Sequence, residues 1–363
     1  MERHPSKVRR GDEVTEPTPA PAGLTPDPTL VVTGAAGWLG QNLLRTTRPD
    51  RERIRALAQD EGQAALLAVL GPNVEPVVGD VRDPVAVARL FDGLDAPTVV
   101  HTAAVIHPTD GVRQMFDVNV GGTEVVLDQA RRSGARRVVH ISSTSPFGAN
   151  PRPGERFTED SPRNPFVGYG GSKHEAELLV ERAHARGDVE TVILRAPWFY
   201  GPWQPERQAR FFAGLRRGRF PLVGDGSNRR SMVYTGHLVQ GVLRAEAVEA
   251  AAGRDYWIAD AEPYRVADVY RTVKEALAAE GLGPVGYQPR LPRLAGVVAE
   301  GLDRAAQSRG AYVQALHVLG EMKDEIAVDV TRARTELGYD PATTLVDGMR
   351  TSIRWCLEHG QEL

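Results

Sequence analysis

The 363-residue chain lacks several features, and each absence excludes a class of protein. It has a single cysteine, Cys356, so it cannot form an internal disulfide, and its core must hold the fold, as suits a reducing compartment. No run approaches the roughly 18 apolar residues of a membrane-spanning helix, and residues 1–28 lack the apolar stretch of a signal peptide. The net charge of −3 provides no basic field for nucleic acid. We therefore expect a cytoplasmic globular protein with no nucleic-acid or membrane partner.

The first segment of the chain lacks large apolar side chains. Residues 1–28 are instead rich in proline and charge. Such a segment cannot bury enough surface to offset the entropy lost on ordering. We therefore predict a disordered tail over residues 1–28, and we prefer a solvated tail to an anion-binding segment although basic residues dominate its first ten positions.

From Thr29 onward, short apolar runs alternate with longer segments of helical periodicity. The runs are bounded by Gly, Pro or polar turns and read TLVVTG, IRALA, VEPVVGD, TVVHTAA, RRVVHISS and ETVILRAP. Continuous Val, Ile and Leu without polar alternation are typical of parallel strands covered on both faces, with helices as the crossovers. The sequence thus predicts an α/β fold with a Rossmann-type, doubly wound parallel sheet over residues 29–200. A smaller C-terminal substrate-binding lobe over residues 201–363 should be interleaved with the last strands of the sheet.

A glycine-rich loop follows the first predicted strand. The stretch VVTGAAGWLG places Gly34, Gly37 and Gly40 between that strand and the start of a helix, with Trp38 and Leu39 inside the motif. The missing side chains let backbone N–H groups approach a pyrophosphate at the positive end of the helix. Because a strand precedes the loop and a βαβ rhythm follows it, the pattern predicts a dinucleotide-binding loop.

The second and third predicted strands end at positions that would meet the adenosine half of the dinucleotide. Asp60, after IRALAQ, could accept a hydrogen bond from the ribose 2′-hydroxyl of NAD. Arg53 and Arg55 lie close by in the sequence and could favour the 2′-phosphate of NADP, so the choice between NAD and NADP stays open. Asp80 and Val81, in VVGDVRD, are placed to contact the adenine.

Two tyrosine–lysine pairs share one spacing, and only their context separates them. Tyr169 and Lys173, in YGGSK, begin a helix after a proline-containing loop, downstream of a strand that ends in Ser143. Tyr270 and Lys274 lie within the periodic segment VADVYRTVKEALAA, which predicts an amphipathic surface helix without a catalytic role. A helix that begins at Tyr169 brings that side chain to the carboxyl ends of the parallel strands, where such sheets bind ligands.

The first pair has a chemical rationale. Moving a proton to or from an alcohol at neutral pH needs a group with a pKa near 7, whereas free tyrosine has a pKa of about 10. We expect the Lys173 ammonium and the positive nicotinamide ring to lower the pKa of Tyr169, and Ser143 to hold the substrate oxygen. Ser143, Tyr169 and Lys173 are then the catalytic residues, and the nicotinamide carries the hydride.

Two histidines near the fourth predicted strand do not predict a metal site. His101 lies at the end of an apolar strand, and His107 follows six residues later. No third ligand stands at a suitable spacing, so we expect no bound metal.

These motifs give the chain a resemblance to the extended short-chain dehydrogenases/reductases, the family of sugar-nucleotide epimerases, dehydratases and 3β-hydroxysteroid dehydrogenases. The matching stretches follow the family order over nearly the whole chain and read TGAAGWLG, GDVRD, HTAA, NVGGT, ISSTSPFG, YGGSK, LRAPWFYGP and RRSMVY. The resemblance implies that Tyr169 is the acid/base, that Lys173 binds the nicotinamide ribose and tunes Tyr169, and that Ser143 completes the triad. It implies further cofactor contacts at Thr102, Ala103, Ala104, Asn119 and Pro197.

Departures from the family patterns bear on the substrate. The 4,6-dehydratases carry an Asp-Glu pair directly after the catalytic hydroxyl, and here Thr144 and Ser145 stand there, so a dehydratase is not expected. Many sugar-nucleotide enzymes place an Asn where this chain has Trp198, which is similar to the aromatic position of steroid dehydrogenases. Arg230 nevertheless stands where sugar-nucleotide enzymes hold the diphosphate with a forked guanidinium. The candidate substrate contacts are Thr144, Trp198, Arg207 and Arg230.

Together these features predict an NAD(P)-dependent oxidoreductase or epimerase that acts on a secondary alcohol or ketone, in first choice that of a sugar nucleotide. One alternative is a 3β-hydroxysteroid-type or other lipid-alcohol dehydrogenase, suggested by Trp198 and the apolar segment LPRLAGVVAEGL. The other is a non-enzymatic NAD(P)-sensing binding module. The resemblance also implies a homodimer through helices near 111–133 and 169–186, which would form a four-helix bundle.

Overall fold

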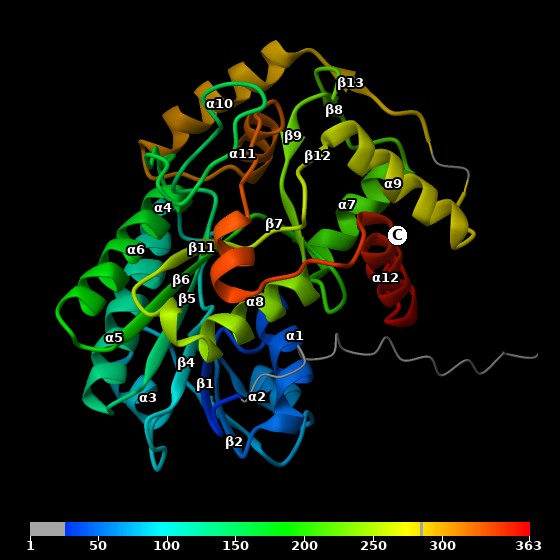
Figure 1. The fold of residues 1–363 in the computed structure, drawn as a ribbon. Helices are drawn as coiled ribbons and strands as arrows, with labels where there is room; N and C mark the ends of the chain where they lie inside the picture. The colour runs from blue at the N-terminus through cyan, green and yellow to red at the C-terminus, as the bar shows by residue number, and fades with distance from the viewer. Residues whose placement is uncertain (1–25, 284–285) are drawn as a thin grey trace, which may run out of the picture.

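The computed structural model describes residues 26–283 and 286–363, so the tail predicted over residues 1–28 lies almost entirely outside the described residues. A seven-stranded sheet, parallel throughout, forms the centre of the first lobe in the order β3-β2-β1-β4-β5-β6-β11 (Figure 1). This order confirms the predicted doubly wound Rossmann fold. The strands are β1 (Thr29–Thr33), β2 (Arg53–Ala58), β3 (Val74–Val78), β4 (Thr98–His101), β5 (Arg137–Ser143), β6 (Glu190–Ala196) and β11 (Asp255–Trp257).

Helices cover both faces of this sheet. Because strand side chains alternate between faces, Leu30 and Val32 of β1 pack against α1 and α8, whereas Val31 packs against α3, α5 and α6. A π-helical stretch, Asp117–Gly121, joins α4 to α5. The helices are α1 (Trp38–Thr47), α2 (Glu61–Ala68), α3 (Pro84–Arg89), α4 (Val112–Phe116), α5 (Gly122–Arg132), α6 (Tyr169–Ala185) and α8 (Thr235–Ala247).

A second, smaller lobe lies beyond the carboxyl ends of the strands (Figure 1). Its core is rich in aromatic and aliphatic side chains from α7, α9 and α12. Strand β11 and helix α8 come from the same half of the chain but belong to the first lobe. The second lobe contains α7 (Glu206–Arg216), α9 (Val266–Ala279), α10 (Arg293–Gln307), α11 (Gln314–Glu321), α12 (Leu345–Glu358), β7 (Trp198–Tyr200), β8 (Leu222–Val223), β9 (Arg229–Arg230), β10 (Met232–Tyr234), β12 (Tyr264–Arg265) and β13 (Arg290–Leu291).

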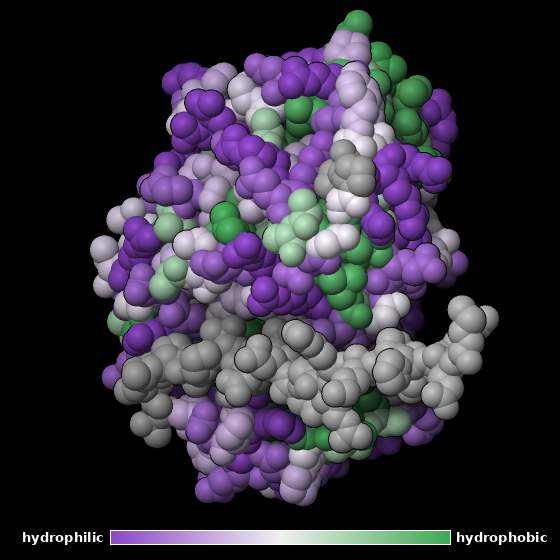
Figure 2. Space-filling model, turned by 90° about the vertical axis from the view of Figure 1, so that its right-hand side faces the viewer, coloured by the Kyte–Doolittle hydropathy of each residue, from purple (hydrophilic) through white to green (hydrophobic). Residues whose placement is uncertain are grey.

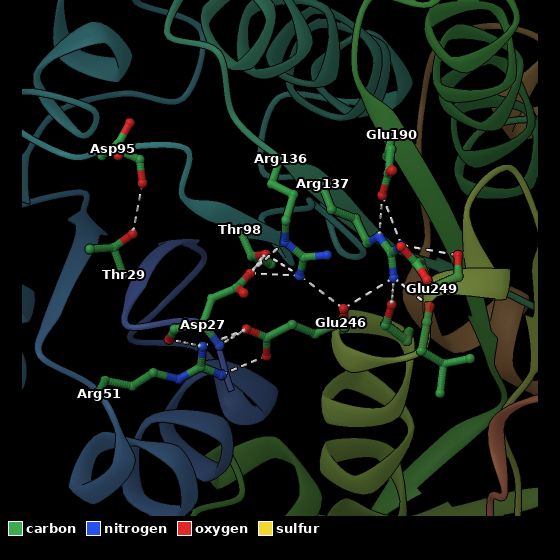
Figure 3. Close-up of polar contacts among 12 residues, drawn as sticks. Asp27, Thr29, Arg51, Asp95, Thr98, Arg136, Arg137, Glu190, Glu246 and Glu249 are labelled. Carbon is green, nitrogen blue, oxygen red and sulfur yellow. Dashed lines mark hydrogen bonds and ion pairs between the residues drawn. The ribbon is translucent and has the colours of Figure 1, made fainter. Parts of the chain in front are cut away.

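A buried network of arginines fixes α8 to the amino ends of the strands (Figure 3). Arg51 donates to both carboxylate oxygens of Glu246, at 2.6 Å to Oε2, and both side chains are fully buried. Arg137, the first residue of β5, donates to the carbonyls of Ala245 and Val248, each at 2.7 Å. These carbonyls lie at the carboxyl end of α8, where no helical N–H is left to donate to them. The Arg137 guanidinium supplies the missing hydrogen bonds, and its positive charge stabilises the negative end of the helix dipole.

The same network holds the start of the described chain. The carboxylate of Asp27 accepts hydrogen bonds from Thr98 and Arg136, and its backbone N–H donates to Glu246 at 3.1 Å. Asp27 is therefore tied to the amino edge of the sheet, opposite the edge at which ligands of such folds bind. Among the helices of residues 26–283 and 286–363, none is long and apolar enough to cross a membrane.

Candidate active site

The glycine loop brings β1, the loop after β4 and the start of α1 close together. Gly34 has a φ of +68°, and a Cβ there would lie 2.7 Å from the backbone N of Ala103, so only glycine fits. A Cβ at Gly40 would overlap the carbonyl of Gly34. Helix α1 begins after Gly37 with no side-chain cap and no acidic residue in its first turn. Its first N–H groups therefore remain available for an anion such as a pyrophosphate.

The two other residues of the motif have distinct positions. The side chain of Leu39 is buried in the hydrophobic core between α1 and the sheet, so only the backbone of Leu39 could contact a ligand. Trp38 donates its indole N–H to the carbonyl of Pro202 at 2.8 Å, which joins the loop to the start of the second lobe. The loop is thus fixed from both lobes.

The residues expected near the adenosine ribose lie toward opposite ends of β2. Asp60 follows the carboxyl end of β2, is exposed, and caps α2 by accepting from the N–H of Gln63 at 2.8 Å. Arg53 is the first residue of β2, roughly 16 Å from its other end. Arg53 and Arg55 both pair with Glu75, at 2.6 and 3.3 Å. Only Asp60 therefore lies at the edge where the ribose would bind.

Asp80 and Val81, which follow β3 and Gly79, differ in their exposure. The exposed carboxylate of Asp80 pairs with Arg82 at 2.6 Å, and this pairing lowers the pKa of Asp80. Val81 is buried, and a Cβ at Gly122 would lie only 2.8 Å from it. Val81 thus packs against the start of α5, and Asp80, the residue before it, is exposed to solvent.

The loop after β4 contains three of the expected cofactor contacts, Thr102, Ala103 and Ala104. Thr102 donates to the carbonyl of Thr33 through its N–H at 3.2 Å and its hydroxyl at 2.9 Å, so this loop runs beside the glycine loop. Asn119 is buried, exchanges hydrogen bonds with the backbone of Val105 at 2.7 and 3.0 Å, and donates to Ser172 Oγ at 2.9 Å. Asn119 therefore fixes the loop to α6.

Ser143 and Tyr169 meet at the carboxyl edge of the sheet. Ser143 is the last residue of β5 and Tyr169 the first of α6. Burial raises the pKa of Tyr169 to about 12, while a hydrogen bond with Ser143 and the charge of Arg207 act in the opposite direction. Tyr169 is therefore a neutral phenol at pH 7, which is a proton donor held beside a second hydroxyl.

Lys173 lies one turn further along α6 and is buried. Its Nζ donates to the carbonyl of Ile141 at 2.7 Å and lies 3.1 Å from Nε2 of His140. Burial lowers the pKa of Lys173 to about 8, with the charge of Glu177 opposing that shift. The expected lowering of the Tyr169 pKa by Lys173 is not found here, because the ammonium is directed at β5 and the pKa of Tyr169 is raised instead.

His140 is a contact that the sequence analysis missed. It is buried in β5, and burial holds its pKa well below 6.5, so it is neutral. Since an ammonium can only donate, Nε2 of His140 must accept from Lys173. The available signal was a histidine within the apolar run RRVVHISS, three residues before Ser143.

The two histidines considered for a metal have other partners. The ring of His101 lies 2.6 Å from Thr33 Oγ1 and 2.9 Å from Thr123 Oγ1. Nδ1 of His107 lies 2.9 Å from the hydroxyl of Tyr312. Within residues 26–283 and 286–363, no group of three or more His, Cys, Asp or Glu side chains could hold a metal ion.

The expected substrate contacts do not form one cluster. Trp198 hydrogen-bonds Gln208 at 3.3 Å and packs edge-on against Phe211, so it belongs to the core of the second lobe. Pro197, before it, is buried, and so is Thr144. Arg207 is exposed on α7, and its charge acts on Tyr169, His107 and Tyr312. Of the expected substrate contacts, Arg207 therefore lies near Tyr169, and His107 and Tyr312, which sequence analysis did not assign to the substrate, lie near Arg207.

Arg230 has a protein partner. It donates to the backbone carbonyl of Glu321 at the end of α11, and its guanidinium lies 3.9 Å from the carboxylate of the same residue. Its Nε is buried without a hydrogen-bond partner among the described residues. Arg230 therefore retains donor capacity, but part of it is occupied by Glu321.

The second tyrosine–lysine pair lies in a different environment. Helix α9 is amphipathic as expected, but Tyr270 faces inward, is buried in the second lobe and is 3.4 Å from the carbonyl of Pro221. Burial raises its pKa. A hollow of about 230 Å³ beside Tyr270 and Lys274 contains none of the triad residues. The pair therefore lies away from the glycine loop and Ser143.

Comparison with known proteins places this geometry in a family. Residues 30–259 match the model of the "NAD dependent epimerase/dehydratase family". The chain is 41% identical to the uncharacterized protein y4nL of Sinorhizobium fredii, over 92% of this chain and 96% of that protein. It is 32% identical to the 3 beta-hydroxysteroid dehydrogenase/Delta 5-->4-isomerase of Mycobacterium tuberculosis, over 68% of this chain and 69% of that protein.

A solved structure shows the same arrangement of elements. The dTDP-glucose 4,6-dehydratase DesIV from Streptomyces venezuelae, crystallised with NAD, superposes with a TM-score of 0.72 at 25% identity, over 91% of this chain and 97% of that chain. Because the match covers 91% of this chain, it extends over both lobes. The chain therefore belongs to the NAD-dependent epimerase/dehydratase family of extended short-chain dehydrogenases/reductases.

Proposed function

We propose that this protein is an NAD-dependent oxidoreductase or epimerase that acts on a secondary alcohol or the matching ketone, with Tyr169 as its acid/base. The observation that carries the proposal is the contact between the Tyr169 and Ser143 hydroxyls at the carboxyl edge of the sheet. The uncapped start of α1 lies at the same edge, after β1. In this proposal the first lobe binds the dinucleotide, the second lobe binds the substrate, and the protein is a homodimer through α4, α5 and α6.

The residues present fit a dinucleotide. The N–H groups at the start of α1 would hold the pyrophosphate, and Asp60 would accept from the adenosine ribose. NAD is preferred to NADP because Glu75 already neutralises Arg53 and Arg55, which lie toward the other end of β2. When bound, the nicotinamide accepts or supplies a hydride.

The side chains of the triad transfer the proton to or from the substrate oxygen. A neutral Tyr169 can donate to a ketone oxygen at pH 7, and Ser143 can stabilise the charge that develops there. In the direction of oxidation, Tyr169 must first lose its own proton. Lys173, positioned by His140 and Ile141, is one turn away on α6, where it can bind the nicotinamide ribose.

These protonation states predict different pH dependences for the two directions of the reaction. We expect oxidation of the alcohol to accelerate as pH rises from about 6 to about 9, by up to about tenfold per unit, because the pKa of Tyr169 is about 12 and phenolate is scarce at lower pH. Reduction of the ketone should show no such rise. Initial rates in each direction at saturating cofactor test this, and an oxidation rate that falls with pH would contradict the role of Tyr169 as the base.

A sugar nucleotide is the first candidate substrate. Arg230 keeps an unpaired donor that suits a diphosphate, and the DesIV relative acts on dTDP-glucose. Elimination of water is not part of the proposal, because Thr144 and Ser145 replace the acidic pair of the 4,6-dehydratases. A net oxidoreductase would consume added NAD or NADH, whereas an epimerase would retain its cofactor through a complete turnover.

A lipid alcohol is the second candidate, and two observations favour it. Trp198 packs against Phe211, which places an aromatic ring where many sugar-nucleotide enzymes have an amide. Arg230 is held by Glu321, so a diphosphate would have to compete for it. The 32% identical hydroxysteroid dehydrogenase supports the same candidate.

Replacing Arg230 by Ala separates the two substrate classes. For a sugar nucleotide we expect KM to rise roughly 10- to 100-fold, because a charged hydrogen bond to the diphosphate is lost. For a steroid KM should change little. The matched control is Arg229→Ala, an exposed neighbour in the same strand. An unchanged KM for the best sugar nucleotide, in a variant that melts like the wild type, would end the preference for the first class.

A further inference from the structure

Helix α10 has its polar side turned inward and its apolar side turned outward. Asp303 is 1% exposed and Gln307 is also buried. In contrast, the large aliphatic side chains of the helix are at least half exposed: Leu294, Val297, Val298 and Leu302. A surface helix of a globular protein normally has the reverse arrangement, with its apolar stripe on the core.

Specific polar contacts fix this orientation. The carboxylate of Asp303 accepts from Gln307 at 2.9 Å and lies 2.9 Å from Nδ1 of His317 on α11. Glu300, one turn earlier, pairs with the buried Nζ of Lys323 at 2.7 Å. A rotation that buried the aliphatic side would break the contacts of Asp303 with His317 and of Glu300 with Lys323, so the outward stripe is built into the fold.

The exposed aliphatic residues form one continuous stripe. They recur at intervals of three, one and four residues, which places them on one face over more than two turns. Figure 2 shows hydrophobic residues gathered at the top of the molecule, the end at which Figure 1 places α10. Within residues 26–283 and 286–363, the stripe stays at least half exposed, so no other described segment buries it.

The charges around the stripe are positive. Arg290 precedes α10, Arg293 is its first residue and Arg309 follows its end; all three are exposed and none forms an ion pair within 4 Å among the described residues, although the charge of Arg290 lowers the pKa of Asp225. The acidic residues of the helix are already paired: Asp303 with His317, and Glu300 with Lys323 and with Arg304 of the same helix. The aliphatic stripe is therefore flanked along the chain by exposed arginines at both ends of α10, and the 82% exposed Tyr287 precedes them.

We propose that α10 docks on the surface of an anionic lipid bilayer, with its aliphatic stripe in the boundary between headgroups and acyl chains and its arginines on the phosphates. Apolar side chains flanked by arginines are what an interfacial helix needs. The expectation of no membrane partner rested on the absence of a spanning segment, which a helix lying in the surface does not require. A second copy fits less well, because antiparallel α10 helices would bring Arg293 close to Arg309 of the other copy.

Vesicle flotation with the full chain tests this. We expect binding to phosphatidylcholine vesicles that contain phosphatidylglycerol, weaker binding without it, and release by salt. The double variant Val298→Glu, Leu302→Glu should bind at least about tenfold less, because it places two charges in the stripe. The matched control is Val69→Glu, Val85→Glu, which adds the same charge at two valines that are even more exposed and lie on the first lobe.

Three results would overturn the proposal. The wild type could fail to bind the anionic vesicles, or both double variants could lose binding equally, which would point to net charge alone. Alternatively, sedimentation without vesicles could show a dimer that Val298→Glu, Leu302→Glu alone dissociates, which would assign the stripe to a second copy. None of these outcomes depends on the reaction proposed for Tyr169, and thermal unfolding of both double variants at the temperature of the wild type shows that they fold.

Discussion

Replacing Tyr169 by Phe should lower kcat by about 10²- to 10⁴-fold while NAD binding persists. The change removes only the hydroxyl that meets Ser143, and the loss of a positioned acid/base has an effect of this size. The ring remains at the start of α6, so neither the glycine loop nor Lys173 should move. Turnover of the best substrate, followed through nicotinamide absorbance, gives kcat, and quenching of protein fluorescence gives the affinity for NAD.

The chain supplies its own control for this variant. Tyr270→Phe makes the same change in the second tyrosine–lysine pair, at a hydroxyl in the core of the second lobe, and should leave kcat unchanged. If Tyr169→Phe keeps full activity, the acid/base assignment is wrong. If wild type and variant bind NAD equally and neither turns over any alcohol or ketone, the NAD-sensing alternative replaces the enzyme.

The parts of the fold that local pattern determines could be predicted from the sequence. Successive side chains of β1 face opposite sides of the sheet, and both sides are buried. The continuous aliphatic run TLVVT predicts this arrangement, because a strand covered on only one face would alternate with polar residues. The position of the glycine loop follows equally from local order, because Gly34 and Gly40 allow a turn and a close approach that side chains would prevent.

Features that depend on distant contacts could not be predicted. Arg53 and Arg55 lie near Asp60 in the sequence, but a strand is extended, and its length carries Arg53 to the amino end. The hydrogen bonds of Lys173 to β5 depend on how α6 packs against that strand. Tyr270 was expected on a surface, and the second lobe buries it instead.

The orientation of α10 shows the same limit more sharply. Its periodicity predicts an amphipathic helix but does not say which side faces the protein. The answer depends on Asp303 meeting His317, fourteen residues away, and on Glu300 meeting Lys323. Such pairs form only once α11 has packed, so the usual assumption that the apolar side is buried fails here.

Replacing Glu246 by Gln should lower the free energy of unfolding by about 3–5 kcal/mol. Arg51 and Glu246 are both fully buried, so the variant leaves the Arg51 guanidinium without its counter-charge in a medium that solvates it poorly. Urea denaturation followed by circular dichroism measures the loss. Because the pair lies at the amino edge of the sheet, kcat of the folded variant should match that of the wild type (Figure 3).

A second substitution shows whether the charge itself is responsible. In the double variant Arg51→Met, Glu246→Met both charges are absent, so much of the lost stability should return, because a buried ion pair contributes little beyond an apolar pair of similar volume. The exposed pair Arg210–Glu206 is the control, and Glu206→Gln should change stability by less than about 0.5 kcal/mol. If the double variant is less stable than Glu246→Gln, the pair stabilises the fold through its geometry, including the contact with Asp27, and not through charge compensation alone.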